Sequence, residues 1–121
     1  MTTNVQVRRI YDASEPTDGK RVLVDRLWPR GVSKERAALF EWCKDVAPSP
    51  GLRQWYGHDP EKFDEFAKRY RHELEDPERS AALDGLRVLA ADGTLTLLTA
   101  SKRDDISEAT VLQGILNSPA S

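Results

Sequence analysis

Alternating and continuous apolar residues mark three short segments of the chain as strands. Val5 and Val7 alternate with polar residues across residues 5–11, a period that favours a half-buried strand. The run Val22-Leu23-Val24 and the segment 94–99 are short, apolar and rich in β-branched residues. Both have the composition of strands buried on two faces. The pattern therefore predicts strands near 5–11, 20–26 and 94–99.

Apolar residues at helical spacing predict the helices. The clearest stripe has members three or four positions apart, namely Phe63, Phe66, Ala67, Tyr70 and Leu74. Further stripes follow Asp76-Pro77 and Ser107, and short helices are expected after Ser33 and Ser49-Pro50, where serine can cap the first turn. Asp59-Pro60 is a start signal of the same kind. Residues 40–46 fit either a helix or a strand, so their periodicity leaves both open.

The order of these elements indicates an α/β fold. Several helices lie between the strands near 20–26 and 94–99, and so long a crossover allows the two strands to be parallel. The loop between the first two strands is short for such a crossover. The strand at 5–11 therefore either pairs antiparallel with 20–26 or is not its direct neighbour. We predict one domain over residues 1–121, ordered from about 5 to 117, with a small mixed or mainly parallel sheet flanked by helices.

Composition narrows the classes of protein. The formal net charge of −2 argues against a general nucleic-acid binder. The lone cysteine, Cys43, cannot form an internal disulfide, and the N-terminus does not resemble a signal peptide. No apolar run approaches the length of a membrane span. These observations predict a cytoplasmic protein without a membrane partner, and the ends, 1–4 and 118–121, are expected to fray.

The candidate site lies where the strand near 20–26 ends. Asp25, Arg26, Trp28 and Arg30 follow that strand closely, and Ser101 and Lys102 follow the strand at 94–99. Ligands of α/β folds bind beyond the carboxyl ends of strands, and guanidinium groups match phosphate or carboxylate. Two alternatives stay open for Asp25, an ion-pair partner that orients an arginine and a catalytic base. The arginines and Trp28 can equally be a salt-bridged surface loop.

Other candidates come from the helical crossover. Arg53 can reach the site from the segment after Ser49, and His58, in irregular backbone beside Asp59, is the best candidate for an acid or base. The alternative for His58 is a neighbour of a helix cap with no chemistry. Tyr70, between two arginines, can place its hydroxyl at the rim of a pocket.

No cofactor or metal is expected. The chain contains no glycine-rich phosphate loop and no dinucleotide fingerprint, and one cysteine and two histidines do not have the spacing of a zinc site. Cys43 has no arginine six positions later, as a phosphatase cradle requires, because Ser49 stands there. A small buried hydrophobic residue is the favoured interpretation of Cys43.

Several of these motifs together resemble the DUF488 family, bacterial proteins of unknown function. The resemblance covers residues 5–117 and rests above all on the string Asp25-Arg-Leu-Trp-Pro-Arg-Gly31. It adds Lys44 and Ser49 to the characteristic positions. One departure concerns the final helix, which often opens with Asn-His in the family and here has Ser107-Glu108.

Three hypotheses follow from the sequence. The first is a pocket for a small anionic ligand, such as a phosphorylated metabolite or nucleotide, either in an enzyme or in a binding protein. Its ligand-binding residues would be Arg26, Trp28, Arg30, Lys44, Ser49, Arg53, Tyr70, Ser101 and Lys102, and its catalytic residues His58 and Asp25. The second is a nucleic-acid-binding or regulatory module that uses the same arginines. The third is a structural ion network of Asp25, Arg26 and Arg30 with no pocket. The sequence leaves the oligomeric state undetermined.

Overall fold

Four parallel strands form the centre of the fold in a computed structural model, which describes residues 4–117 without the side chain of Asp104. The strands are β1 (Val5–Arg9), β2 (Lys20–Leu23), β3 (Glu41–Trp42) and β4 (Leu95–Thr99). Their order in the sheet is β1-β4-β2-β3. The fraying predicted for the two ends falls almost entirely on residues outside the described range.

The topology confirms the predicted parallel sheet. Strand β4 lies between β1 and β2, so that Leu97 pairs with Val7 on one side and with Val22 on the other. The first strand is therefore not the direct neighbour of the second, which was one of the two alternatives. Since all the strands run in the same direction, the segments that follow β2 and β4 leave the same edge of the sheet.

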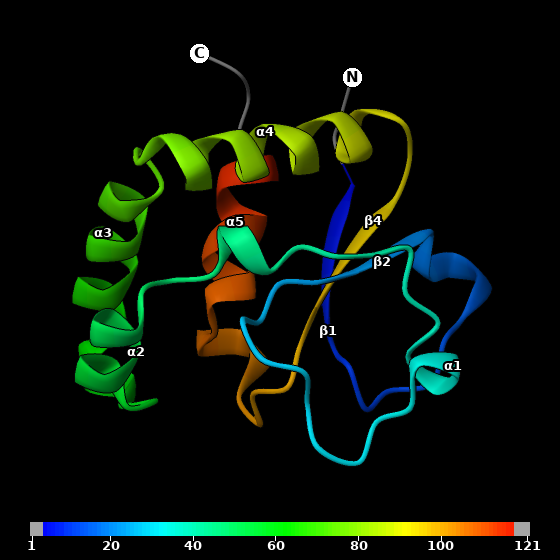
Figure 1. Ribbon diagram of the computed structural model, residues 1–121, viewed down its shortest axis with the longest axis horizontal. Coiled ribbons are helices and arrows are strands. Elements are labelled where there is room, and N and C mark those ends of the chain that lie inside the picture. The colour runs from blue at the N-terminus through cyan, green and yellow to red at the C-terminus, as the bar shows by residue number, and fades with distance from the viewer. Residues whose placement is uncertain (1–3, 118–121) are drawn as a thin grey trace.

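Five α-helices surround the sheet (Figure 1). They are α1 (Lys34–Ala37), α2 (Pro50–Tyr56), α3 (Phe63–Glu73), α4 (Pro77–Ala91) and α5 (Glu108–Asn117). The predicted caps form at α1 and α2, where the hydroxyls of Ser33 and Ser49 accept hydrogen bonds from backbone amides. None of the helices in the described range is long and apolar enough to cross a membrane.

The ambiguous segment 40–46 divides into two elements. Its first part is the edge strand β3, and its second is a single 3-10 turn over Lys44–Val46. Phe40 is 57% exposed, whereas Val46 is fully buried. Tertiary contacts with β2 therefore decided between periods that the sequence left equal.

The two faces of the sheet are covered by different parts of the chain. Val22, Leu95 and Leu97 face the large core formed with α2, α3, α4 and α5. Leu23 and Leu98 face a smaller core with Ala37 of α1. This alternation is the normal period of a strand. Figure 1 shows α2, α3 and α5 on one side of the strands, α1 on the other, and α4 across the top.

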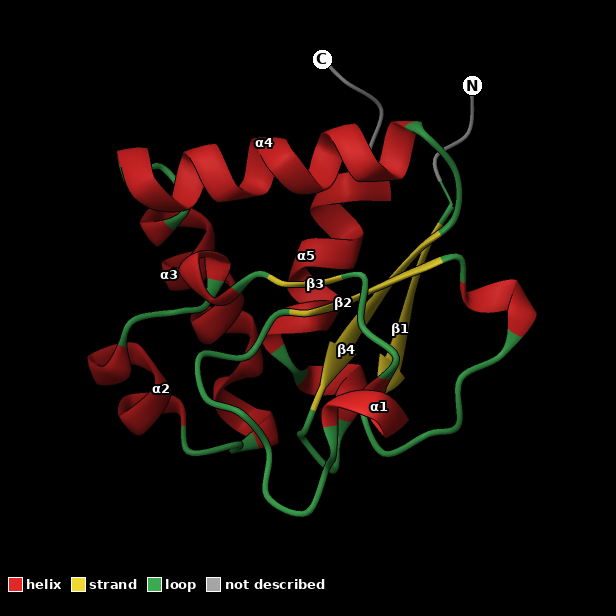
Figure 2. Ribbon diagram, turned by 45° about the vertical axis from the view of Figure 1, so that its right-hand side comes forward, coloured by secondary structure: helices red, strands yellow, loops and turns green. Residues whose placement is uncertain are grey.

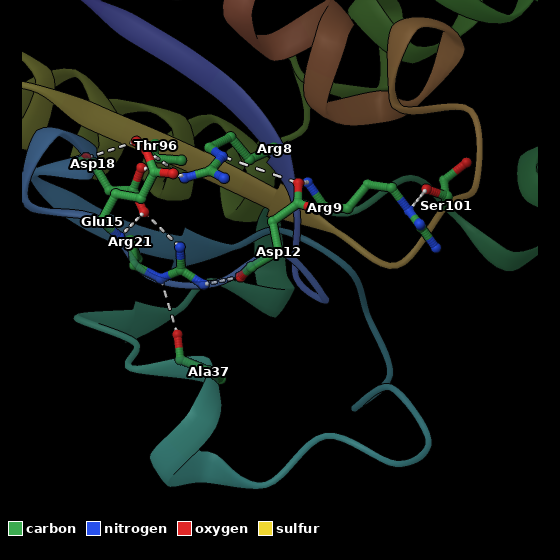
Figure 3. Close-up of polar contacts among 9 residues, drawn as sticks. All are labelled: Arg8, Arg9, Asp12, Glu15, Asp18, Arg21, Ala37, Thr96 and Ser101. Carbon is green, nitrogen blue, oxygen red and sulfur yellow. Dashed lines mark hydrogen bonds and ion pairs between the residues drawn. The ribbon is translucent and has the colours of Figure 1, made fainter.

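A buried ion pair fixes the start of β2 (Figure 3). The Arg21 guanidinium lies 2.6 Å from the Asp18 carboxylate, and both side chains are almost fully buried. Arg8 of β1 reaches the same carboxylate at 2.8 Å, and the Thr96 hydroxyl donates to the Asp18 carbonyl. These contacts connect β1, β2 and β4 away from the edge that carries the candidate site.

Two tryptophans hold the loop from residue 24 to residue 33. Figure 2 shows the course of the backbone after β2. The Trp42 indole N–H donates to the Asp25 carbonyl at 2.8 Å, and the Trp28 indole N–H donates to the Val32 carbonyl at 2.8 Å. The two rings meet edge to face with centroids 5.4 Å apart. This packing gives the loop a defined course without helix or strand.

Candidate functional site

A pocket of about 420 Å³ opens at the carboxyl edge of β2 and β4. We call it the edge pocket. Its buried lining residues are Asp25, Pro48, Tyr56, Phe66, Thr99 and Ser107. Its more exposed lining residues are Pro50, Arg53, Gln54, His58, Ala100, Ser101 and Glu108. The location is the one where open α/β sheets hold their ligands.

Asp25 joins the ends of the two central strands. Its Oδ1 accepts a hydrogen bond from the Thr99 hydroxyl at 2.9 Å, and its Oδ2 accepts from the Ala100 amide at 2.7 Å. Asp25 forms no ion pair with Arg26 or Arg30 among the described residues, so the ion network of the third hypothesis is not formed there. Thr99 and Ala100 are the last residue of β4 and the residue after it, and they reach Asp25 because the parallel pairing brings the two strand ends together.

Glu108 is the second carboxyl group of the edge pocket. It is the first residue of α5, is only partly exposed, and its side chain is hydrogen-bonded to Asp25. Burial, reinforced by that hydrogen bond and by the charge of Asp25, raises the pKa of Glu108 well above its ordinary value. Glu108 therefore keeps its proton to a higher pH than an ordinary glutamate, and its protonated carboxyl donates a hydrogen bond to Asp25. We call these two residues the carboxyl pair.

Arg53 and His58 lie at the mouth of the edge pocket. Arg53 belongs to α2, is exposed and forms no ion pair within the described part of the chain. His58 follows Gly57, and both residues have positive φ, 57° and 54°, where the backbone turns sharply after α2. The positive charge of Arg53 acts on Glu108, so the cation and the carboxyl pair share one electrostatic environment.

Ser101 also lines the edge pocket, and a neighbouring strand holds its backbone. The Arg9 guanidinium donates to the Ser101 carbonyl at 3.1 Å (Figure 3). The Ser101 amide donates to the Thr99 hydroxyl at 3.2 Å, the same hydroxyl that donates to Asp25. Lys102, the next residue, is exposed and is not among the lining residues.

The predicted arginines do not converge on one anion. Arg26 and Lys44 line a separate groove of about 430 Å³, together with Leu27, Asp45, Ala47, Glu78 and Arg79. We call this the basic groove. Arg30 is exposed and lines neither the edge pocket nor the basic groove. A clamp that combines Arg26, Arg30 and Arg53 is therefore not formed, because the loop after β2 leads its arginines away from α2.

Three other predicted ligand-binding residues make structural contacts. Tyr70 is fully buried, and its hydroxyl donates to the Val46 carbonyl, so the expectation of a rim hydroxyl is wrong. Ser49 caps α2 and its hydroxyl donates a hydrogen bond to Glu73, and Trp28 packs against Trp42.

Cys43 is buried, in agreement with its interpretation as a small hydrophobic residue. Burial, together with the charge of Glu41, raises the pKa of its thiol to about 11, which is typical of an unreactive cysteine.

Sequence reasoning missed Glu108, Gln54 and Tyr56 as lining residues. The Tyr56 hydroxyl donates to the Ile106 carbonyl at 2.6 Å. Burial raises the pKa of Tyr56 to about 12. In the sequence, Glu108 stood out only as part of Ser107-Glu108, which replaces the Asn-His pair often found in the family. That departure, together with the position of Glu108 soon after the strand predicted at 94–99, is the signal that could have found it.

Comparison with known proteins assigns the chain to a family. The family model described as the inactive DUF488-N3 subclade matches residues 4–121. An uncharacterised protein of Mycobacterium tuberculosis strain H37Rv, Rv3073c, is 51% identical over 115 residues, which are 95% of each chain. The uncharacterised protein YeaO of Escherichia coli K12 is 39% identical over 117 residues, covering 95% of this chain and 98% of YeaO.

The chain therefore belongs to the DUF488 family, in its YeaO-like branch. This membership confirms the resemblance found in the sequence. No solved structure gives a significant match.

Proposed function

We propose that this protein binds a small acidic ligand in the edge pocket and does not turn it over. The observation that carries the proposal is Arg53, an exposed guanidinium at the mouth of a preformed pocket, without an ion pair among the described residues. A guanidinium matches a carboxylate or phosphate in shape and charge. The apolar walls formed by Pro48, Tyr56 and Phe66 would hold the rest of the ligand.

Two observations favour binding over catalysis. The matching subclade is described as inactive. Asp25, one of the two predicted catalytic residues, accepts hydrogen bonds with both carboxylate oxygens and so already serves to join β2 to β4. His58 would then contact the ligand at the mouth rather than transfer a proton. The lone, buried Cys43 supports a cytoplasmic location as part of the same proposal.

A thermal-shift and calorimetry panel of aromatic and aliphatic carboxylates, sugar phosphates and nucleotides tests the proposal. A ligand at a hundred times its Kd stabilises a protein by about 2.7 kcal/mol, which such a panel detects. The Arg53→Gln variant should weaken the bound acid at least about tenfold, equivalent to about 1.4 kcal/mol. Arg36→Gln on the exposed surface of α1 is the matched control and should bind normally. No stabilisation by any acid would contradict the proposal.

The basic groove supports a second candidate, a site for a phosphate group. Three cations line it, Arg26, Lys44 and Arg79, against two acids, Asp45 and Glu78. Arg79 is positioned by a hydrogen bond of 2.9 Å to the Ala47 carbonyl, and the Lys44 ammonium lies 5.2 Å from the centroid of the Trp42 ring. Phosphate binding that is lost in Arg26→Gln but kept in Arg53→Gln would assign the anion to the groove instead.

A further inference from the structure

We infer that the ligand of the edge pocket is a zwitterion of the amino-acid class, with its carboxylate at Arg53 and its ammonium group at the carboxyl pair. This inference rests on the proposed function and names the chemistry of the same site. It uses two features of one cavity, an arginine at the mouth and a pair of facing carboxyl groups at the strand ends.

The charges of the edge pocket favour such a ligand over a simple anion. A dianion that meets Arg53 would also meet Asp25, whose charge opposes it. A ligand with one positive and one negative group instead places each group beside an opposite charge. Three other titratable groups lie near these charges. His58, just after α2, lines the pocket, and Tyr56 of α2 both lines it and interacts with Glu108. Tyr70 of α3 also interacts with Glu108.

The carboxyl pair can receive an ammonium group because it holds a displaceable proton. Asp25 is anchored on both oxygens by Thr99 and Ala100, so it stays in place when its partner changes. On binding, the proton between Glu108 and Asp25 leaves to solvent, and the ammonium group of the ligand donates to both carboxylates in its place. The total charge balances, since one cation replaces another.

The walls of the cavity indicate a ligand with a large apolar side chain. Tyr56 and Phe66 stack with ring centroids 4.2 Å apart and interplanar angle of 15°, and both line the edge pocket with Pro48 and Pro50. A volume of about 420 Å³ falls in the range of sites that take small molecules. Phenylalanine and leucine are therefore the probes of choice.

The test compares matched compounds by titration calorimetry. L-Phenylalanine has both charged groups, 3-phenylpropanoate lacks the ammonium group, and 2-phenylethylamine lacks the carboxylate. L-Leucine and 4-methylpentanoate form a second matched pair. We expect each amino acid to bind at least tenfold more tightly than its matched compounds. We also expect heats that depend on the ionisation enthalpy of the buffer, as they must when binding releases a proton.

The variant Glu108→Gln provides the sharpest control. Its amide can still donate to Asp25, which preserves the fold, but it has no proton to release and no second negative charge. The variant should bind phenylalanine at least tenfold more weakly and should lose most of the preference for phenylalanine over 3-phenylpropanoate. Arg53→Gln should weaken both compounds.

The possible outcomes separate the two proposals. If 3-phenylpropanoate binds as tightly as phenylalanine, or if other acids bind while the amino acids do not, the zwitterion inference is wrong and the acid pocket stands. If neither these compounds nor any acid of the wider panel binds, both proposals are wrong.

Discussion

Two carboxyl groups, the buried Asp18 and the partly buried Glu108, respond to their surroundings in opposite ways. Burial alone would raise the pKa of Asp18, but hydrogen bonds from the Glu15 amide, Arg8 and Arg21 outweigh it and leave that pKa below its ordinary value. Glu108 has Asp25 as its neighbour instead, so burial and negative charge both raise its pKa. The sign of the nearest charge therefore decides which carboxyl is ionised, although both are shielded from solvent.

The Asp18–Arg21 pair predicts a large effect on stability. Asp18→Asn leaves Arg21, 3% exposed, without its counter-charge, and breaking one side of a buried pair costs about 3–5 kcal/mol. Urea unfolding near neutral pH measures the change. Glu65→Gln removes half of the exposed pair with Arg69 and should change stability by only about 0.5 kcal/mol. Equal effects of the two substitutions would contradict a structural role for Asp18.

The Asp18–Arg21 pair also makes the stability of the fold depend on pH in the acid range. A carboxyl whose folded pKa is lowered stabilises the fold above its unfolded value, near 3.8 for Asp18, and that contribution disappears as the pH falls through the folded value. The Asp18→Asn variant should therefore show a flatter loss of stability in acid than the natural protein.

For Glu108 we predict a dependence of stability on pH that has the opposite sign. Because its folded pKa lies above the unfolded value, the folded state binds more protons between the two values, and the free energy of unfolding falls as the pH rises through that interval. Glu108→Gln should remove this slope, by about 1.4 kcal/mol for each unit of the pKa difference. Urea unfolding of both proteins from about pH 5 upward measures it, with Glu65→Gln as the control. Parallel curves for Glu108→Gln and the natural protein would show that Glu108 is not shielded.

At the scale of elements, we expect a glycine to contribute more to stability where another backbone segment approaches it closely than where it lies in an open turn. Gly19 precedes β2 with a φ of 62°, and a Cβ atom there would lie 2.3 Å from the Thr94 carbonyl oxygen. Gly31, in the loop after β2, has a φ of 77°, but a Cβ atom there would contact nothing within 4 Å. Positive φ is a cost that both positions share, whereas the steric clash belongs to Gly19 alone.

Alanine substitution should separate these two costs. Gly31→Ala should destabilise the protein by about 1–2 kcal/mol, the penalty of left-handed backbone. Gly19→Ala should cost at least about 2 kcal/mol more, because Thr94 lies beside Gly19 at the start of β4 and cannot move without disturbing the sheet. Thermal or urea unfolding of the pair of variants measures the difference. Gly31→Ala as the more harmful change would contradict this assignment.

At the scale of the whole molecule, the distribution of charge argues against nucleic acid as a partner. Arg53 lies at the edge pocket and Arg26 at the basic groove, whose lining also carries Asp45 and Glu78. Nucleic-acid binding depends on several neighbouring cations that neutralise consecutive phosphates. Separate cations, some beside acids, on a chain of formal net charge −2 do not meet this need.

The expected result is therefore flat fluorescence anisotropy when labelled single- and double-stranded DNA and RNA are titrated with the protein at low salt. Low salt is the most favourable condition for such binding, so its absence there is informative. Binding that weakens steeply as salt rises, and that Arg26→Gln and Arg53→Gln both reduce, would contradict this expectation and revive the nucleic-acid hypothesis.

The sequence by itself determined the elements and much of their arrangement. The alternating and continuous apolar segments predicted three of the four strands, and the length of the crossover predicted that β2 and β4 are parallel. These are local properties, set by side-chain period and by the reach of the chain. They were enough to place Asp25 and Ser101 at the same edge of the sheet, where the structure has them.

Only the tertiary structure decided which side chains meet at that edge. Asp25 and Ala100 are 75 residues apart in sequence, and the pair of Asp25 with Glu108 spans a similar distance. The course of the loop after β2 separated Arg26 and Arg30 from Arg53. Such pairings depend on packing between elements, whose energies are not encoded in the period of any single segment.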